Sequence, residues 1–419
     1  MSNNSSNSSP KLRQKLRMAA CVLVAANSNA NAQSVANAWE VDTSYLSYTE
    51  SDERVSVAKS LANLVKRTDQ SSFKVNLVHD TMSGASPTGA IRSEDSAVTY
   101  TSASGGSFSA TGGGDYSKSA FDDTRIQAGL TYQHEPKRLI KMSYGALVSQ
   151  ESDYDSFGAN IEFALDNEKR LNTYTLGLAF TGDTIYRSDT GGTPEPLSEV
   201  GIGRPFTAGK RTTVDTLLGF SRILNEQTVA QFNVTFSRSS GYHSDPYKII
   251  SAADSEDRIL SNFHDSRPAS RTKTALYSRL IHKLKGSDNS INLSYRLYMD
   301  DWGIVSHTAD ARYRFQINKK HFLEPHLRLY RQSKADFYYR KLDVDANTNP
   351  VLPDDGLASA DYRLDSITSS TIGLKYGMNI APGKQFRLRA EYLNQWFATS
   401  DYKELGAVIL QASFRFGFK

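Results

Sequence analysis

Long runs of side chains that alternate between apolar and polar dominate the chain after residue 38. A period of two residues is that of a β-strand with one apolar and one polar face. The runs are about 10–14 residues long, which exceeds the usual five or six and matches strands that cross a bilayer at a tilt. In residues 291–300, for example, one face holds Ile291, Leu293, Tyr295, Leu297 and Met299. A soluble sandwich also alternates, so it is strand length that favours a transmembrane β-barrel.

The alternation predicts about sixteen strands. Their expected ranges are 40–50, 53–66, 71–81, 124–134, 138–149, 154–165, 171–184, 211–223, 228–240, 271–284, 290–301, 305–318, 321–334, 361–380, 384–398 and 403–418. In the second range, Val55, Leu61 and Val65 also fit one face of a helix. A helix there would leave fourteen strands.

The lengths of the connections give a second argument. Long connections follow the third, seventh, ninth and thirteenth strands, at 82–123, 185–210, 241–270 and 335–360, and every connection after an even strand is short. In an up-and-down meander, odd and even connections emerge at opposite ends, and outer-membrane barrels have long extracellular loops and short periplasmic turns. An open sheet edge in hydrocarbon is too costly, so the sheet must close. We therefore expect an all-β, antiparallel, up-and-down transmembrane barrel.

The N-terminus has the features of an export signal. Residues 11–17 are basic, residues 18–26 form a short apolar core, and Ala30-Asn31-Ala32 precedes Gln33 as a cleavage site would. We expect a secretory signal peptide at 1–32 and a single barrel domain at 33–419. A buried helix at a domain start is the alternative, and Cys21 lies inside the apolar core rather than after it, which disfavours a lipid anchor.

Removal of residues 1–32 changes the charge and cysteine content. It would leave 45 basic and 45 acidic residues and no cysteine. A mature chain without cysteine has no disulfide and no thiolate metal site. A net charge of zero argues against a nucleic-acid-binding protein.

Aromatic residues are expected at two kinds of position. An alternating stripe near the C-terminus, Phe414, Phe416 and Phe418, offers an apolar edge strand to the barrel-assembly machinery. Others fall near predicted strand ends, where amphipathic rings are stable at headgroup level. These are Tyr132, Tyr154, Tyr174, Phe220, Phe322, Phe386 and Trp396, and the alternative is that they pack a core.

The later strands aim charged residues at the expected lumen. The basic set is Arg296, Arg312, Arg314, Arg328, Lys375, Arg387, Arg389 and Arg415. The acids Asp300, Asp310, Glu324 and Glu391 accompany them, together with His326. Inward charges need water or partners. A wet, positive lumen would attract anions, whereas a network of ion pairs would rigidify a plugged barrel.

Motifs for catalysis or cofactor binding are missing from the sequence. It contains no G-x-S-x-G, H-E-x-x-H or phosphate-binding loop. His321 and His326 are five residues apart, which places them on opposite faces of a strand. We expect no catalytic residue, no cofactor and no enzyme activity. A candidate calcium site is the run of oxygen ligands Asp343, Asp345, Asn347, Asn349 and Asp354.

Two segments carry a family resemblance. They are YTESDERVSV at 48–57 and DTMSGASPTGA at 80–90, of which Gly84–Ala90 is the most specific part. With these segments and the long-strand layout, the chain resembles a family of Gram-negative outer-membrane barrels classed as a domain of unknown function. The resemblance implies the fold and an outer-membrane location. It also suggests an envelope redox context, and it implies no biochemical activity.

Three hypotheses for function remain. The first is a porin-like channel with an arginine-rich lumen. The second is a non-conducting scaffold or receptor for an envelope partner, with a redox-related partner as one case. The third is an integral outer-membrane enzyme. The expected partners are outer-membrane lipid and lipopolysaccharide, the assembly machinery and a periplasmic protein, without nucleic acid.

Overall fold

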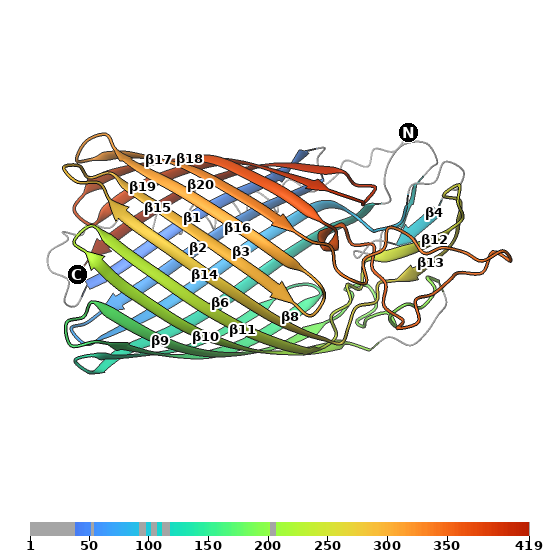
Figure 1. Ribbon diagram of the computed structural model, residues 1–419, viewed down its shortest axis with the longest axis horizontal. Coiled ribbons are helices and arrows are strands. Elements are labelled where there is room, and N and C mark those ends of the chain that lie inside the picture. The colour runs from blue at the N-terminus through green and yellow to red at the C-terminus, as the bar shows by residue number, and fades with distance from the viewer. Residues whose placement is uncertain are drawn as a thin grey trace, which may run out of the picture.

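The computed structural model describes residues 38–51, 54–91, 98–101, 107–110, 118–201 and 207–418. Sixteen strands form one closed barrel in the order β1-β2-β3-β6-β7-β8-β9-β10-β11-β14-β15-β16-β17-β18-β19-β20 (Figure 1). Every neighbouring pair is antiparallel. The prediction of a sixteen-stranded, all-antiparallel barrel is confirmed, and the fourteen-strand alternative is wrong. The expected signal peptide, 1–32, lies outside the described residues.

The strands of the barrel run across almost the whole described chain. Their bounds are β1 Ala38–Glu50, β2 Val55–Arg67, β3 Ser71–Pro87, β6 Lys118–Lys137, β7 Ile140–Gln150, β8 Tyr154–Asp166, β9 Asn172–Ile185, β10 Gly209–Asn225, β11 Thr228–Gly241, β14 Ser270–Lys283, β15 Ser290–Asp300, β16 Val305–Gln316, β17 His321–Gln332, β18 Ile367–Ala381, β19 Lys384–Phe397 and β20 Glu404–Phe418.

Among the described residues, two short hairpins and the 3-10 helix η3 lie outside the barrel. The hairpins pair β4 (Val98–Thr101) with β5 (Ser107–Ala110), and β12 (Ile249–Ala253) with β13 (Ile259–His264). A 3-10 helix, η3, spans Tyr362–Leu364, and the Asp361 side chain caps it by accepting a hydrogen bond from the backbone N–H of Arg363. The strand expected at 361–380 therefore begins later, at Ile367, because this turn occupies its first residues.

Closure joins the first strand to the last. The register runs from Trp39 opposite Phe418 to Glu50 opposite Ala407. This pairing satisfies the backbone groups of both edge strands, as a hydrocarbon environment requires. The stripe Phe414, Phe416 and Phe418 lies on β20, with successive ring centroids 5.6 and 5.8 Å apart.

The outer face of the barrel carries large exposed apolar side chains. Ile126, Ile372 and Phe232 are 62%, 65% and 54% exposed. An apolar outer band of this kind suits lipid. No helix among the described residues is long and apolar enough to span a membrane.

Two of the aromatic residues expected at the membrane interface point inward instead. Tyr132, Tyr174 and Trp396 are exposed on the outer face. Tyr154 instead accepts a hydrogen bond from Arg211, and Phe322 is 1% exposed beneath Arg314. Position near a strand end was the signal in the sequence, and it does not distinguish the two faces of the strand.

Strand β2 inverts the expected rule that apolar side chains face out. Lys59 pairs with Asp80 across the β2–β3 register at 3.4 Å. Since alternate residues share a face, Val57, Leu61 and Val65 point inward with Lys59. The opposite face of β2 holds small side chains such as Ser56, Ala58 and Ser60.

Connecting segments at the long-loop end fold together. We call the cap the segments 88–91, 186–201, 242–269, 301–304, 333–366 and 398–403, which extend beyond one end of the barrel (Figure 1). Its contacts join strands far apart around the barrel: the N–H of Ile249, after β11, donates to the carbonyl of Thr88, after β3, at 2.9 Å. Because β3 and β11 are six steps apart in the barrel order, the cap crosses the mouth.

Apolar clusters hold the cap together. One contains Ile250, Phe263 and Leu342, and a second contains Trp302, Phe337 and Leu364. Each draws on segments from different connections, so burial of apolar surface favours their association over separate flexible loops.

Candidate functional site

The register places the expected lumen residues on one face of the wall. In β15–β17, Arg296 stands opposite Thr308, and Asp310 stands opposite Arg328. This face is opposite to the one that carries exposed Leu327 and Leu329. By the same alternation, the inward face holds all of Arg296, Arg312, Arg314, Arg328, Lys375, Arg387, Arg389, Arg415, Asp300, Asp310, Glu324 and Glu391.

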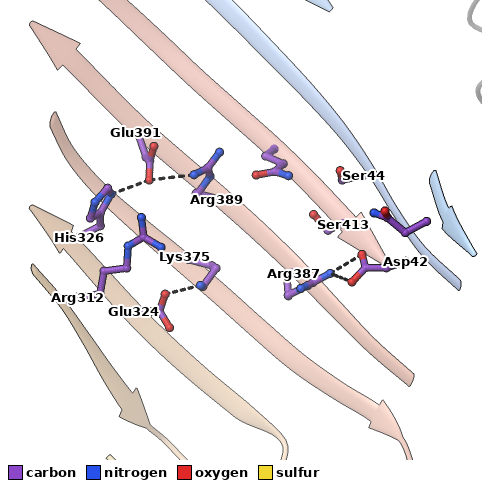
Figure 2. Close-up of a pocket in the computed structure, with 12 residues that line it drawn as sticks. Asp42, Ser44, Arg312, Glu324, His326, Lys375, Arg387, Arg389, Glu391 and Ser413 are labelled. Carbon is purple, nitrogen blue, oxygen red and sulfur yellow. Dashed lines mark hydrogen bonds and ion pairs between the residues drawn. The ribbon is translucent and has the colours of Figure 1, made fainter. Parts of the chain in front are cut away.

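Asp42, which was not identified from the sequence, binds two arginines of this wall. Asp42 of β1 accepts hydrogen bonds from Arg387 at 2.7 Å (Figure 2). It also accepts one from Arg415 at 2.9 Å. The β1–β20 pairing brings it there, since Asp42 is the register partner of Arg415. The sequence does contain a signal for it, because alternation in residues 40–50 places Asp42 on the polar, inward face of the strand.

His326 of β17 links a carboxylate of β16 to a carboxylate of β19. Its Nδ1 lies 2.9 Å from Glu391 and its Nε2 lies 2.7 Å from Asp310. Arg389 also contacts Glu391 at 3.4 Å, and Lys375 pairs with Glu324 (Figure 2). His321, by contrast, contacts Tyr376 at 2.6 Å. The two histidines do not share a site.

On β15–β17, three inward arginines have no carboxylate partner among the described residues: Arg296, Arg314 and Arg328. Arg314 lies over the Phe322 ring, 3.6 Å from its centroid, and Arg296 lies over Tyr298 at 5.5 Å. Arg328 is exposed to the lumen. Cation–π contact offsets part of the desolvation of a guanidinium and does not neutralise it. These side chains leave positive charge on the wall of β15–β17.

Two hollows lie along the inner wall. One, of about 270 Å³, lies among Asp42, Arg312, Lys375, Arg387 and Glu391 (Figure 2). The other, of about 470 Å³, is lined by Glu162, Asp215, Lys273 and Arg296, and small residues such as Gly177 and Ala275 make room for it. Charged side chains line both hollows.

The cap contains a buried network of charges. Asp361 accepts hydrogen bonds from Arg267 at 2.9 Å and from Arg363, and Arg267 also donates to Asp265 at 2.6 Å. The side chains of Asp361 and Asp265 are completely buried, and that of Arg267 is 11% exposed. Burial alone would raise the pKa of Asp361, but Arg363 and Arg267 together hold it well below its usual value.

Lys248 extends this network to the other side of the mouth. It donates to Ser86 Oγ at 3.0 Å and to the carbonyl of Pro87, and its ammonium lies 5.6 Å from the Tyr362 ring centroid. Burial lowers the pKa of Lys248 more than the neighbouring Asp361 raises it. Lys248 thus contacts both the end of β3, which lies within Gly84–Ala90, and η3.

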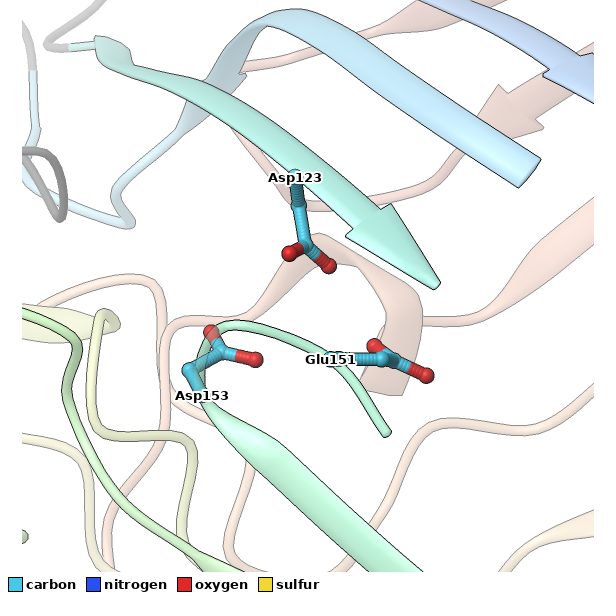
Figure 3. Close-up of side chains that lie close together, drawn as sticks. All are labelled: Asp123, Glu151 and Asp153. Atoms are coloured by element: carbon cyan, nitrogen blue, oxygen red, sulfur yellow. The ribbon is translucent and has the colours of Figure 1, made fainter. Parts of the chain in front are cut away.

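Three acids converge at the long-loop end, beside the turn between β7 and β8. Carboxylate oxygens of Asp123, Glu151 and Asp153 lie within 4.8 Å of one another, and the three side chains point toward a common space (Figure 3). Ser152 donates to Asp123 from its backbone N–H at 3.1 Å and from its hydroxyl at 2.5 Å. Burial, with help from the neighbouring acids, raises the pKa of Glu151 to about 7 and that of Asp153 to about 6. Such oxygens are the type that calcium binds.

The loop expected as a calcium candidate folds into a tight turn. Asp345 accepts hydrogen bonds from the backbone N–H groups of Asn347 and Asn349, both at 2.8 Å, and from the Asn349 side chain at 3.1 Å. Asp343, Asp345 and Asp354 do not form a group of three converging carboxylates, whereas Asp123, Glu151 and Asp153 do. The oxygen spacing in the sequence reflects turn formation here, because Asp and Asn cap their own backbone in turns.

A closed antiparallel barrel with an apolar outside, a charged inside and long loops at one end defines an outer-membrane β-barrel protein. The chain belongs to the family described as protein of unknown function DUF3570, whose model matches residues 13–411. No curated protein matches it.

Solved structures with a similar fold include a monoaromatic hydrocarbon channel, CymD. The sequence identity is 6%, the alignment covers 92% of this chain and 89% of that one, and the TM-score is 0.41. The P. putida toluene transporter TodX is 8% identical, with 92% and 91% covered and a TM-score of 0.38. Pseudomonas aeruginosa OccK2 is 7% identical, with 91% and 97% covered and a TM-score of 0.40.

Proposed function

We propose that this protein is a channel in the Gram-negative outer membrane that favours small anionic solutes. The observation that carries the proposal is that each of the adjacent strands β15–β17 has an inward arginine without a carboxylate partner: Arg296, Arg314 and Arg328. The signal at 1–32 would direct export, and the barrel would be inserted by the assembly machinery with its long loops outside. The proposal assigns no enzymatic step to the chain.

Electrostatics supports a preference for anions. A low-dielectric wall focuses the field of its charges into the lumen and raises the local concentration of counter-ions. The pairs that Asp42, Glu324 and Glu391 form neutralise much of the remaining positive charge. The unpaired arginines therefore dominate the field along β15–β17. A sixteen-stranded barrel is wide enough to hold water.

Ion selectivity in planar bilayers tests the proposal. The wild-type protein should pass chloride in preference to potassium, as the reversal potential in a salt gradient reports. The triple variant Arg296→Glu/Arg314→Glu/Arg328→Glu should reverse this preference. A matched control, Lys285→Glu/Lys319→Glu/Lys320→Glu, makes the same charge change on exposed residues at the short-turn end and should leave the preference nearly unchanged. Cation preference in the wild type would overturn the assignment.

A receptor or scaffold is the second candidate, and the cap favours it. Ordered segments that cross the mouth and bury ion pairs present a defined surface, as a receptor for an extracellular ligand would. A non-conducting barrel could also serve an envelope protein at its short turns. Absence of any conductance from the correctly folded protein, together with recovery of one defined partner after cross-linking, would favour this function over the channel.

A further inference from the structure

A groove of about 570 Å³ lies at the long-loop ends of β16–β19. Outward-facing Val305, His307, Arg331 and Trp396 line it, and so do Thr368 and Ser333. Val305 and Trp396 are 42% exposed each. The groove therefore opens on the outside of the barrel, away from the lumen and its arginines.

Two nitrogen donors stand side by side in this groove. His307 and Arg331 are register partners on β16 and β17, and side chains so paired on one face lie close together. Both side chains are exposed, and the Arg331 guanidinium has no hydrogen bond or ion pair among the described residues. The Tyr295 hydroxyl lies 2.7 Å from His307 Nδ1. When that hydroxyl donates, the opposite ring nitrogen carries a hydrogen and can donate in turn.

The lining of the groove contains no carboxylate. Glu404 stands on the next strand as the register partner of Trp396 and does not line the groove. An arginine fork beside a second N–H donor matches the oxygens of a phosphate group. Trp396 beside it is of the type that lies at headgroup level.

We propose that this groove binds the phosphate group of an outer-leaflet lipid, with Arg331 and His307 holding the phosphate and Val305 and Trp396 contacting the apolar part of the lipid. The inference rests on the proposed outer-membrane location and not on conduction. Because the groove lies on the outer face, its loss should leave the channel selectivity unchanged. Failure of this proposal is therefore distinguishable from failure of the proposed function.

Native mass spectrometry of the purified protein with diphosphorylated lipid A tests the assignment. Arg331→Ala should weaken binding about tenfold or more, as expected for loss of a charged hydrogen-bonding partner. Arg331→Lys should restore part of the affinity. The control is Arg238→Ala, which removes an exposed outward arginine on β11 that does not line the groove.

Three outcomes would overturn the proposal. Equal lipid A binding by the wild type and Arg331→Ala would exclude this arginine from the site. Equal binding of dephosphorylated lipid A would exclude recognition of phosphate. Displacement of lipid A by inorganic phosphate at millimolar concentration would indicate a site for the free ion rather than a lipid. Heat-modifiable gel mobility of each variant establishes that the barrel is folded, so that loss of binding is not loss of structure.

Discussion

Asp361→Asn is the substitution that tests most directly whether the buried charges hold the cap over the mouth. The change keeps the volume of the side chain but removes the negative charge between Arg267 and Arg363. Breaking a buried ion pair by removing one partner costs about 3–5 kcal/mol. In Asp361→Asn, Arg267 still has its hydrogen bond to Asp265 at 2.6 Å, and the Arg363 side chain is 54% exposed to water. We therefore expect a loss of stability at the lower end of this range, about 3 kcal/mol. At about 1.4 kcal/mol per factor of ten, the open fraction of the cap should rise about 100-fold.

Trypsin cleavage after Lys341 measures this opening. The next residue, Leu342, is 2% exposed and packs in an apolar cluster of the cap, so cleavage requires the segment to leave its place. When opening and closing are fast relative to cleavage, the cleavage rate follows the open population. The rate should therefore rise about 100-fold in Asp361→Asn, while heat-modifiable mobility shows that the barrel itself remains folded.

Asp354→Asn supplies the matched control. Asp354 lies in the same connection and is exposed, so its substitution should change the cleavage rate less than twofold. A rate for Asp361→Asn no higher than that of this control would refute the reasoning. The buried network would then be incidental to the closure of the cap.

Three further predictions concern pH and packing. Burial lowers the pKa of His264 from 6.5 to about 4. The cap should therefore lose stability as the pH falls from 6.5 to about 4, because the histidine binds a proton in the unfolded state but not in the folded state. In His264→Gln, the tryptic cleavage rate should rise less between pH 7.5 and pH 5 than it does in the wild type. Glu151 has the opposite effect, because its pKa is raised from 4.5 to about 7. As the pH rises through this range, the unfolded state loses its proton first, so the folded state loses stability. The unfolding temperature of Glu151→Gln should therefore fall less between pH 5 and pH 8 than that of the wild type. A Cβ at Gly377 would lie 2.0 Å from the Phe322 ring, against 3.7 Å from the nearest atom at Gly129, so Gly377→Ala should destabilise the barrel by about 1–3 kcal/mol and Gly129→Ala should not, as the temperature of the heat-modifiable shift reports.

Sequence alone determined the barrel. Each strand contacts lipid on one face and faces the lumen on the other, so apolar and polar residues alternate along the sequence. The long connections all follow odd-numbered strands, and this pattern placed the long loops at one end of the barrel and the short turns at the other. The same alternation is enough to assign Arg312 and Glu391 to the inward face. These features are local or periodic, so a single sequence contains them.

Tertiary structure alone decided which charges meet. Arg267 and Asp361 are 94 residues apart in sequence, and Lys248 and Ser86 are 162 apart; their contacts depend on loops that cross the mouth. On the inward face, Gly377 on the next strand leaves room for the Phe322 ring beneath Arg314, and Lys59 of β2 pairs with Asp80 of β3. The alternation of apolar and polar residues does not predict such contacts, because each one needs a partner that is brought near only when the barrel closes and the cap folds.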